Sequence, residues 1–239
     1  MSGAFALFKW QSLFANLDIF AQGFITTILV SLLGLVFSII IGVILGMFAT
    51  TNNFILKAIN RVYVEVIQNT PLVLQIFFLY NGLPHVDIVL PLFSIGVIGV
   101  SVYHGAYIAE VVRSGILAIN RGQFEAGYSQ GFTNVQVMRY IVLPQAVRLM
   151  LPPLTNQCVN LIKNTSVMAM IAGGDLMYQA NSWAGYTLNY APAYLTVAVL
   201  YFVLCFPLTQ LACRLEEKSK QPFAALAKSE SAEKAGAAV

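Results

Sequence analysis

Four consecutive polar residues, Lys163 to Ser166, stand inside an apolar stretch of this sequence. The ammonium of Lys163, the amide of Asn164 and the hydroxyls of Thr165 and Ser166 could together hydrogen-bond a small zwitterion. Ionisable groups inside apolar segments are costly, so each is a candidate for function. We therefore expect this cluster to line a path for a polar solute. A structural alternative stays open: Lys163 could pair with a carboxylate or with helix-end carbonyls, and the other three could join helices.

A second group of polar residues surrounds a proline earlier in the chain. Asn69, Thr70 and Gln75 flank Pro71, which cannot donate a helical hydrogen bond and therefore frees a backbone carbonyl. A loosened turn with polar side chains could gate the same path, and a simple kink would explain it equally well. His104, in the next apolar stretch, could face the path or make a buried hydrogen bond.

No residue pattern in the sequence indicates catalysis or a metal site. The cysteines, Cys158, Cys205 and Cys213, lie in or beside apolar segments without metal-ligand spacing. We interpret them as small packing residues, and we expect no cofactor in this chain.

The composition indicates that these residues are held by helices in a membrane. The chain of 239 residues is 58% hydrophobic and 10% charged, whereas soluble domains are about half apolar and about a quarter charged. A net charge of +3 is too small to suggest nucleic-acid binding. We expect an all-α integral membrane protein, because helices satisfy their own backbone polar groups in lipid.

Apolar segments of about 20 residues predict membrane-spanning helices. Five such segments cover residues 20–49, 62–83, 88–112, 147–172 and 191–213. Prolines make the middle three irregular. Near the end of the third segment, Glu110 and Arg113 are spaced i, i+3, which suits an ion pair on one helical face.

Lysine and arginine decide the orientation, because cytoplasmic loops carry them in excess. With five spans, one side of the membrane holds nearly all the basic residues that lie outside the spans. They are Lys57, Arg61, Arg113, Arg121, Arg139, Arg148, Arg214, Lys218, Lys220, Lys228 and Lys234. The other side holds only Lys9. We therefore expect the N-terminus outside and the C-terminus in the cytoplasm.

The spans divide the chain into three parts. Residues 1–19 are expected to be an extracytoplasmic segment, in which residues 4–17 could form a short helix on the membrane surface. Residues 20–215 form the transmembrane domain, whose first span is too long for the core of a cleavable signal peptide. Residues 216–239 are rich in Ala, Ser, Lys and Glu and are expected to be a disordered cytoplasmic tail.

A polar loop of about residues 119–145 separates the third and fourth spans on the cytoplasmic side, and it reads EAGYSQGFTNVQVMRYIVLP from Glu125 to Pro144. The spacing resembles the EAA motif of ABC-importer membrane subunits: Glu, two Ala, three residues, Gly, nine residues and Ile-x-Leu-Pro. The matching residues are Glu125, Ala126, Gly127, Gly131, Ile141, Leu143 and Pro144. Gly127 replaces the usual second Ala. We expect this loop to couple the chain to a partner protein.

Each residue type in the motif has a physical role in such a loop. Small side chains at Ala126 and Gly127 would let a short helix approach a partner closely, and Gly131 would permit a sharp backbone turn. Glu125 would offer a carboxylate to a basic or hydrogen-bonding partner. Pro144 restricts the residue before it and predicts a break ahead of the next helix.

The resemblance extends over roughly residues 20–215. Segments 63–84, 106–124, 143–148 and 151–167 are similar to the polar amino acid permease family, with its TPL–Q, AE–VR–GI and Lys-[Asp/Asn]-Thr-Ser sequences. It implies a multi-pass protein of the bacterial plasma membrane with five helices and a type I ABC-importer-like core. It also implies that the segment from Lys163 to Ser166 lines the substrate path.

The same resemblance implies partners. Two membrane subunits, identical or related, would each dock a cytoplasmic ATP-binding subunit through the loop, and an extracytoplasmic binding protein would deliver the solute. This chain has no G-x-x-x-x-G-K-[ST] phosphate loop. ATP and Mg²⁺ are therefore expected in the partner subunit, and the chain itself is not expected to be an enzyme.

The sequence defines the solute only by class. Some family members carry Asp where this chain has Asn164, and the missing carboxylate argues against a cationic amino acid. Lys163 favours a neutral or acidic solute, so we expect glutamate, aspartate or glutamine.

Two alternatives come from other classes of protein. One is an ATP-independent channel or secondary carrier for small polar solutes. A proton-coupled carrier would need a carboxylate deep in the bundle, and Asp87 and Asp175 are expected to lie outside it. The other is a membrane scaffold that recruits a cytoplasmic protein, which would not need the polar cluster at Lys163.

Overall fold

The protein is a bundle of helices in the computed structural model, which describes Gly3 and residues 6–236, with side chains as far as Glu217. No strand is present within these residues. In chain order the elements are α1 (Leu7–Phe14), α2 (Leu17–Thr50), α3 (Phe54–Gln68), α4 (Leu72–Phe77), the π-helix η1 (Phe78–Gly82), the 3₁₀-helix η2 (Leu83–Val86), α5 (Leu92–Leu117), α6 (Arg121–Ser129), α7 (Asn134–Val137), the π-helix η3 (Met138–Val142), α8 (Leu143–Asn164), the 3₁₀-helix η4 (Thr165–Ile171), α9 (Leu176–Thr187) and α10 (Tyr190–Gly236).

Three helices in the described chain are long and apolar enough to cross a bilayer: α2, α5 and the part of α10 up to Glu217. A fourth crossing is possible if α3 and the segment Leu72–Val86 form one broken span, bent by 99°. The sequence predicted one helix over residues 62–83, and that prediction is wrong in detail because the chain breaks between Gln68 and Leu72. The predicted fourth span corresponds to α8 followed by η4, and the total of five spans stays a prediction.

Helix α2 buries its small residues and exposes its large ones. The buried positions of its central part are mostly small and recur every three or four residues: Thr27, Val30, Ser31, Gly34, Ser38, Gly42 and Gly46. Leucine, isoleucine and phenylalanine side chains cover the opposite face and are exposed. This pattern is typical of a helix in lipid, where small residues let the backbones of neighbouring helices approach closely.

The central helix of the bundle is α5, which packs most extensively against α2 and also contacts α3, α4 and α8. The side chain of Ser101 is buried and donates to the carbonyl oxygen of Gly34 on α2 at 3.3 Å. A buried apolar cluster around α5 includes Ile76, Ile95 and Met168. Helix α5 is therefore surrounded by other helices on several sides, and its polar residues lie at contacts with them.

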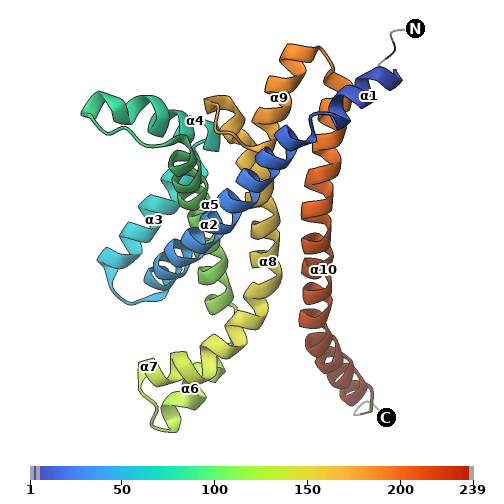
Figure 1. Ribbon diagram of the computed structural model, residues 1–239. Coiled ribbons are helices and arrows are strands. Elements are labelled where there is room, and N and C mark those ends of the chain that lie inside the picture. Colours follow the sequence, from blue (N-terminus) through green and yellow to red (C-terminus); the bar gives the residue numbers. More distant parts are fainter. Residues whose placement is uncertain (1–2, 4–5, 237–239) are drawn as a thin grey trace.

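Short helices α6 and α7 protrude from one end of the bundle, where α5 leads into α8 (Figure 1). The C-terminal end of α10 lies toward this same end, and α1 lies at the opposite end. The predicted orientation requires this arrangement, with the polar loop and the C-terminus on one side. The orientation itself remains a prediction.

Helices lie near both ends of the described chain. Helix α1 falls within the predicted surface helix over residues 4–17, of which residues 4 and 5 lie outside the described residues. Its Leu13 is buried in a cluster with Phe20 and Trp183. The tail was expected to be disordered from residue 216, whereas α10 continues to Gly236. Ala, Glu, Lys and Gln favour helix, which explains the difference; residues 237–239 lie outside the described residues.

Candidate functional site

The motif residues Glu125, Ala126 and Gly127 lie on α6, a short helix capped by the residue before it. The side-chain oxygen of Asn120 accepts a hydrogen bond from the backbone N–H of Gly122 at 2.8 Å. Such a cap satisfies one of the free N–H groups of a helix N-terminus and fixes where the helix begins.

Gly131 ends α6 in the way the sequence predicted. Its φ of +83° lies in the left-handed region, which glycine adopts without steric cost. The N–H of Gly131 donates to the carbonyl of Tyr128 at 2.9 Å, and the N–H of Phe132 donates to the carbonyl of Gly127 at 3.1 Å. These two bonds form a Schellman motif, so the prediction of a sharp turn at Gly131 is confirmed.

The next helix starts directly after this turn through a capping box that the sequence analysis missed. The Thr133 hydroxyl accepts from the N–H of Gln136, and the Gln136 side chain accepts from the N–H of Thr133 at 2.9 Å. The pattern Thr-x-x-Gln before a helix is a known signal for this cap. Together the Schellman turn and the capping box fix the angle between α6 and α7.

Gly127 faces its own chain, which corrects its predicted role at a partner surface. It is buried, and a Cβ atom there would lie 2.8 Å from Ile141 Cδ1 and 2.8 Å from Val137 Cγ2. Side-chain atoms do not approach so closely, so an alanine would require the methyl ends of Val137 and Ile141 to shift. Gly127 therefore packs against α7 and η3 of its own chain.

The outer surface of this protruding unit is partly apolar. Glu125 and Ala126 are exposed. Several large side chains beside them are also exposed, namely Tyr128, Phe132, Val135 and Tyr140. Grouped exposed apolar side chains on a polar loop are typical of a protein contact surface.

Leu143 and Pro144 stand at a change of helix type. The backbone stays helical at Val142 and Leu143, so the predicted break before Pro144 is wrong. Helix α8 instead follows the π-helix η3 directly, with Pro144 in its first turn. Because the helix runs on from η3, Pro144 leaves one carbonyl of the preceding turn without an N–H donor, and the wider π-helical turn of η3 stands at this place. Leu143 is half-buried and Pro144 is exposed.

The polar residues around Pro71 satisfy backbone carbonyls at the break between α3 and α4. In a continuous helix the carbonyl of Ile67 would accept from residue 71, which is a proline without an N–H. The Gln75 side chain donates to this carbonyl at 3.0 Å and to the carbonyl of Thr70 at 3.0 Å. Asn69 and Thr70 likewise donate to carbonyls one turn earlier in α3. All of these contacts hold the bend together.

Replacing Gln75 by leucine is expected to destabilise this bend. Two half-buried carbonyls would lose their donor, which costs about 1–3 kcal/mol of unfolding free energy. The midpoint of thermal unfolding of the purified protein in detergent measures the effect. Gln210→Leu, at an exposed position of α10, is the matched control and should leave the midpoint unchanged. Equal midpoints for Gln75→Leu and the wild type would contradict this role.

His104 joins α5 to α8 through two hydrogen bonds. Its Nδ1 lies 3.3 Å from Gln157 Oε1, and its Nε2 lies 3.1 Å from Asn164 Nδ2. A neutral imidazole with its proton on Nδ1 donates to the Gln157 oxygen and accepts from the Asn164 amide. His104 is 1% exposed. It therefore makes the satisfied buried hydrogen bonds that the sequence left as one of two possibilities.

Two tyrosines adjoin this network on α5. The hydroxyls of Tyr103 and Tyr107 lie 3.1 Å apart, and both rings are half-buried. The ring of Tyr103 also packs edge-on against the His104 ring. Sequence reasoning missed Tyr103, although it stands one turn from Tyr107 on the same face of an apolar helix.

The four residues of the polar cluster at the end of α8 point in different directions. Asn164 belongs to the His104 network, whereas Lys163 is exposed. Thr165 is buried and donates to the carbonyl of Ile162 at 2.7 Å, and Ser166 donates to the carbonyl of Lys163 at 2.7 Å. Lys163 makes no ion pair within the described side chains. The structure thus joins Asn164 with His104 and Gln157, and it does not join them with Asn69, Thr70 or Gln75.

Asp175 is buried, whereas the sequence placed it outside the bundle. It lies at the start of α9, which packs against α2. Its Oδ2 accepts from the N–H of Met177 at 3.0 Å. The backbone N–H of the next residue, Leu176, donates to the hydroxyl of Thr27 on α2. The carboxylate therefore serves as a helix cap at this contact.

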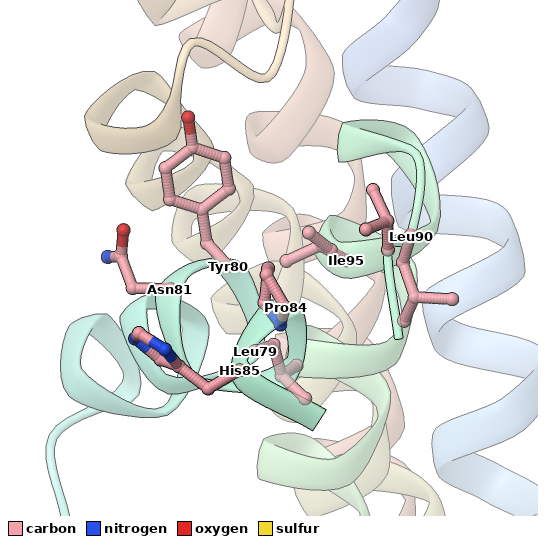
Figure 2. Close-up of a pocket in the computed structure, with 8 residues that line it drawn as sticks. Leu79, Tyr80, Asn81, Pro84, His85, Leu90 and Ile95 are labelled. Atoms are coloured by element: carbon pink, nitrogen blue, oxygen red, sulfur yellow. The ribbon is translucent and has the colours of Figure 1, made fainter. Parts of the chain in front are cut away.

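A hollow of about 380 Å³ lies beside η1 and η2, toward the end of the bundle opposite α6 (Figure 1). Figure 2 shows Tyr80, Asn81 and His85 on one side of this hollow, and Leu90 and Ile95 on the other. None of the predicted site residues lines it. No group of three or more His, Cys, Asp or Glu side chains suited to a metal ion occurs in the described part of the chain.

The chain matches a known family over most of its length. Residues 38–221 match the model of the family described as "Binding-protein-dependent transport system inner membrane component". The chain is 39% identical to the probable glutamine ABC transporter permease protein GlnM of Bacillus subtilis (strain 168), over 88% of this chain and 98% of that protein. It is 33% identical to the glutamine transport system permease protein GlnP of Escherichia coli (strain K12), over 89% of this chain and 98% of that protein.

Solved structures show the same architecture. A crystal structure of an amino acid ABC transporter with histidines superposes with a TM-score of 0.81 at 31% sequence identity, over 87% of this chain and 98% of that chain. An inward-facing structure of the MetNI methionine ABC transporter superposes with a TM-score of 0.71 at 20% identity, and this likeness shows the fold alone. The chain therefore belongs to the family of binding-protein-dependent transport system inner membrane components, and it is a permease subunit of an amino acid ABC importer.

Proposed function

We propose that this permease forms half of a translocation path for an amide or acidic amino acid, and that α6 is the helix that docks a cytoplasmic ATPase. The observation that carries the docking proposal is the protruding unit of α6 and α7. It presents Glu125, Ala126 and a group of exposed apolar side chains at the end of the bundle that also holds the C-terminal end of α10. A rigidly capped helical unit with such a surface suits a lasting protein contact.

The free energy from ATP would reach the translocation path through the contact between α6 and the ATP-binding subunit. ATP and Mg²⁺ would be held by the partner, since this sequence has no phosphate loop. ATP can shift the equilibrium between an outward-open and an inward-open state only through contacts that differ between them. The Schellman turn at Gly131 and the capping box at Thr133 fix α6 and α7 relative to each other, so the two helices would move as one rigid unit. This unit is joined to the continuous helix formed by η3 and α8. The last residue of α8, Asn164, contacts His104.

The full transporter would contain a second permease subunit, identical or related, and an extracytoplasmic solute-binding protein. Five spans, with the N-terminus outside, would place α6 in the cytoplasm. The binding protein would then meet the opposite end of the bundle, where α4 and α9 lie (Figure 1).

The names of the relatives point to glutamine as the solute, because the two relatives described above are named glutamine permeases. The path proposed here includes Lys163, whose ammonium would attract a carboxylate, and the amide network of Gln157 and Asn164. Amides both donate and accept hydrogen bonds, which suits a solute with an amide side chain.

Uptake by the reconstituted transporter tests this function. The permease, its ATP-binding subunit and its binding protein would be placed in vesicles, and entry of labelled glutamine would be followed with and without ATP. We expect ATP-dependent entry that excess glutamate, aspartate or glutamine reduces more than arginine does. Entry without ATP would support the carrier alternative, and stronger competition by arginine would overturn the choice of solute.

Lys163→Met is expected to lower the transport rate by about tenfold or more, since a hydrogen bond to a charged group contributes about 1.5–3 kcal/mol. The side chain is exposed, so the folded subunit should be recovered in normal amounts. Lys163→Arg keeps the charge and should retain more activity. Normal turnover with unchanged affinity for solute in Lys163→Met would show that Lys163 does not line the path.

A further inference from the structure

A charged cavity of about 360 Å³ lies between the ends of α2, α3 and α5, apart from the path and from α6. Its lining includes three cations, Lys57, Arg61 and Arg113, and two carboxylates, Glu65 and Glu110. The lining residues of α3 lie three or four positions apart, as Lys57 and Arg61 do, and therefore share one face of the helix. Helix α3 therefore carries a polar face at this cavity, on which the side chains of Lys57, Arg61 and Glu65 are exposed.

Both carboxylates are already neutralised by arginines. Arg61 Nε lies 2.8 Å from Glu65 Oε1. Arg113 pairs with Glu110, which confirms the ion pair that the sequence predicted. Lys57 makes no ion pair within the described side chains, so the cavity keeps an uncompensated positive charge.

A buried amide also lines the cavity without a full set of partners. Asn60 is 5% exposed, and its Oδ1 has no hydrogen-bond partner among the described residues. Buried polar atoms are nearly always hydrogen-bonded, and each exception needs an explanation. Because phosphate oxygens only accept hydrogen bonds, a phosphate in the cavity would be contacted by the N–H groups of this amide once the side chain turns.

The face of α3 opposite the cavity is apolar, which suits a helix that lies beside lipid. Ile55, Ile59, Val62 and Val66 form a stripe on the side of α3 opposite the cavity, and they are 47% to 66% exposed. The cavity also lies near Thr50 and Leu117, the ends of α2 and α5 nearest to α6.

We propose that this cavity binds the phosphodiester headgroup of an anionic phospholipid from the cytoplasmic leaflet. The proposal rests on the cytoplasmic position of α6 in the proposed function. Lys57 would donate to the phosphate oxygens, and the Asn60 amide would complete the contact. Basic pockets between membrane helices on the cytoplasmic side suit such headgroups.

Lipid retained by the whole transporter tests this site. The complex would be purified from membranes, exchanged into phosphatidylcholine vesicles with graded amounts of phosphatidylglycerol, and assayed for bound phosphatidylglycerol by mass spectrometry. We expect Lys57→Gln to weaken binding about fivefold, and Lys57→Arg to restore most of it. Arg148→Gln, which removes a charge from an exposed position of α8, is the matched control and should have no effect.

Three outcomes would overturn the proposal. One is equal binding of phosphatidylglycerol by Lys57→Gln and the wild type. Another is an equal loss in Arg148→Gln, which would show a general effect of surface charge. The third is displacement of the lipid by millimolar inorganic phosphate, which would assign the cavity to a free anion. If Lys57→Gln is poorly recovered, Asn60→Leu serves as the second variant, with the same expected loss.

ATP-driven uptake in the same vesicles separates this proposal from the function itself. Normal uptake by Lys57→Gln together with normal lipid binding would overturn only the lipid site. Absence of ATP-driven uptake by the wild type in every lipid mixture would overturn the proposed function instead.

Discussion

ATP-driven uptake is expected to fall at least about 30-fold when Ala126 is replaced by tryptophan or Glu125 by lysine. Both residues are exposed on α6, beside exposed Tyr128 and Phe132. A tryptophan at the centre of a close protein contact would separate the two surfaces, and a reversed charge would repel a basic partner. Changes at central contact residues typically cost 2 kcal/mol or more, which corresponds to about 30-fold in binding.

The same variants should fold and insert normally, because neither side chain takes part in the packing of α6 on η3. Asp18→Lys makes the same charge reversal at an exposed position at the other end of the bundle, and it is the matched control. The measurement is uptake by vesicles at equal amounts of inserted permease. Uptake by Ala126→Trp within a factor of two of the wild type would show that this face of α6 is free of a partner.

Loss of the folded subunit is expected for Gly46→Leu and for Gly42→Leu. A Cβ at Gly46 would lie 2.7 Å from the carbonyl oxygen of Ala109 and 2.6 Å from Val112 Cβ. A Cβ at Gly42 would lie 2.5 Å from Ile108 Cβ and 3.0 Å from the backbone nitrogen of Ala109. Neither backbone can move without separating α2 from α5. Overpacking of this kind costs about 1–3 kcal/mol and more where backbone atoms are in the way.

Gly185→Leu is the matched control, since a Cβ at Gly185 on α9 meets no atom within 4 Å. Size-exclusion chromatography of detergent extracts, followed by thermal unfolding, compares the variants. We expect aggregated or missing protein for the two α2 variants and a normal profile for Gly185→Leu. A normal profile for Gly46→Leu would mean that α2 does not pack on α5 as closely as described.

Much of the fold could be predicted from the composition of the chain and the spacing of its residues. Long apolar segments predicted α2, α5 and α10, because only helices satisfy their backbone in lipid. Gly131 was predicted as a turn, since a glycine between two polar helical segments suits the left-handed region. The pair of Glu110 and Arg113 was predicted from helical spacing alone.

Other features depend on contacts between distant parts of the chain. The direction of the bend at Pro71 follows from how α3 and α4 pack on α5. Gly127 was read as a partner contact because its neighbours Val137 and Ile141 come close only through the capped turn between α6 and α7. His104 and Asn164 are separated by 60 residues, so no local pattern could pair them. The capping box at Thr133 is different, because its Thr-x-x-Gln signal was present in the sequence.

The central claim is that α6 docks the ATP-binding subunit. Its most direct measurement is the amount of ATP-binding subunit that co-purifies in detergent with tagged permease, for the wild type and for Ala126→Trp. We expect near-equal molar recovery with the wild type and little or none with Ala126→Trp at the same yield of permease. Equal recovery with both, or none with the wild type, would contradict it.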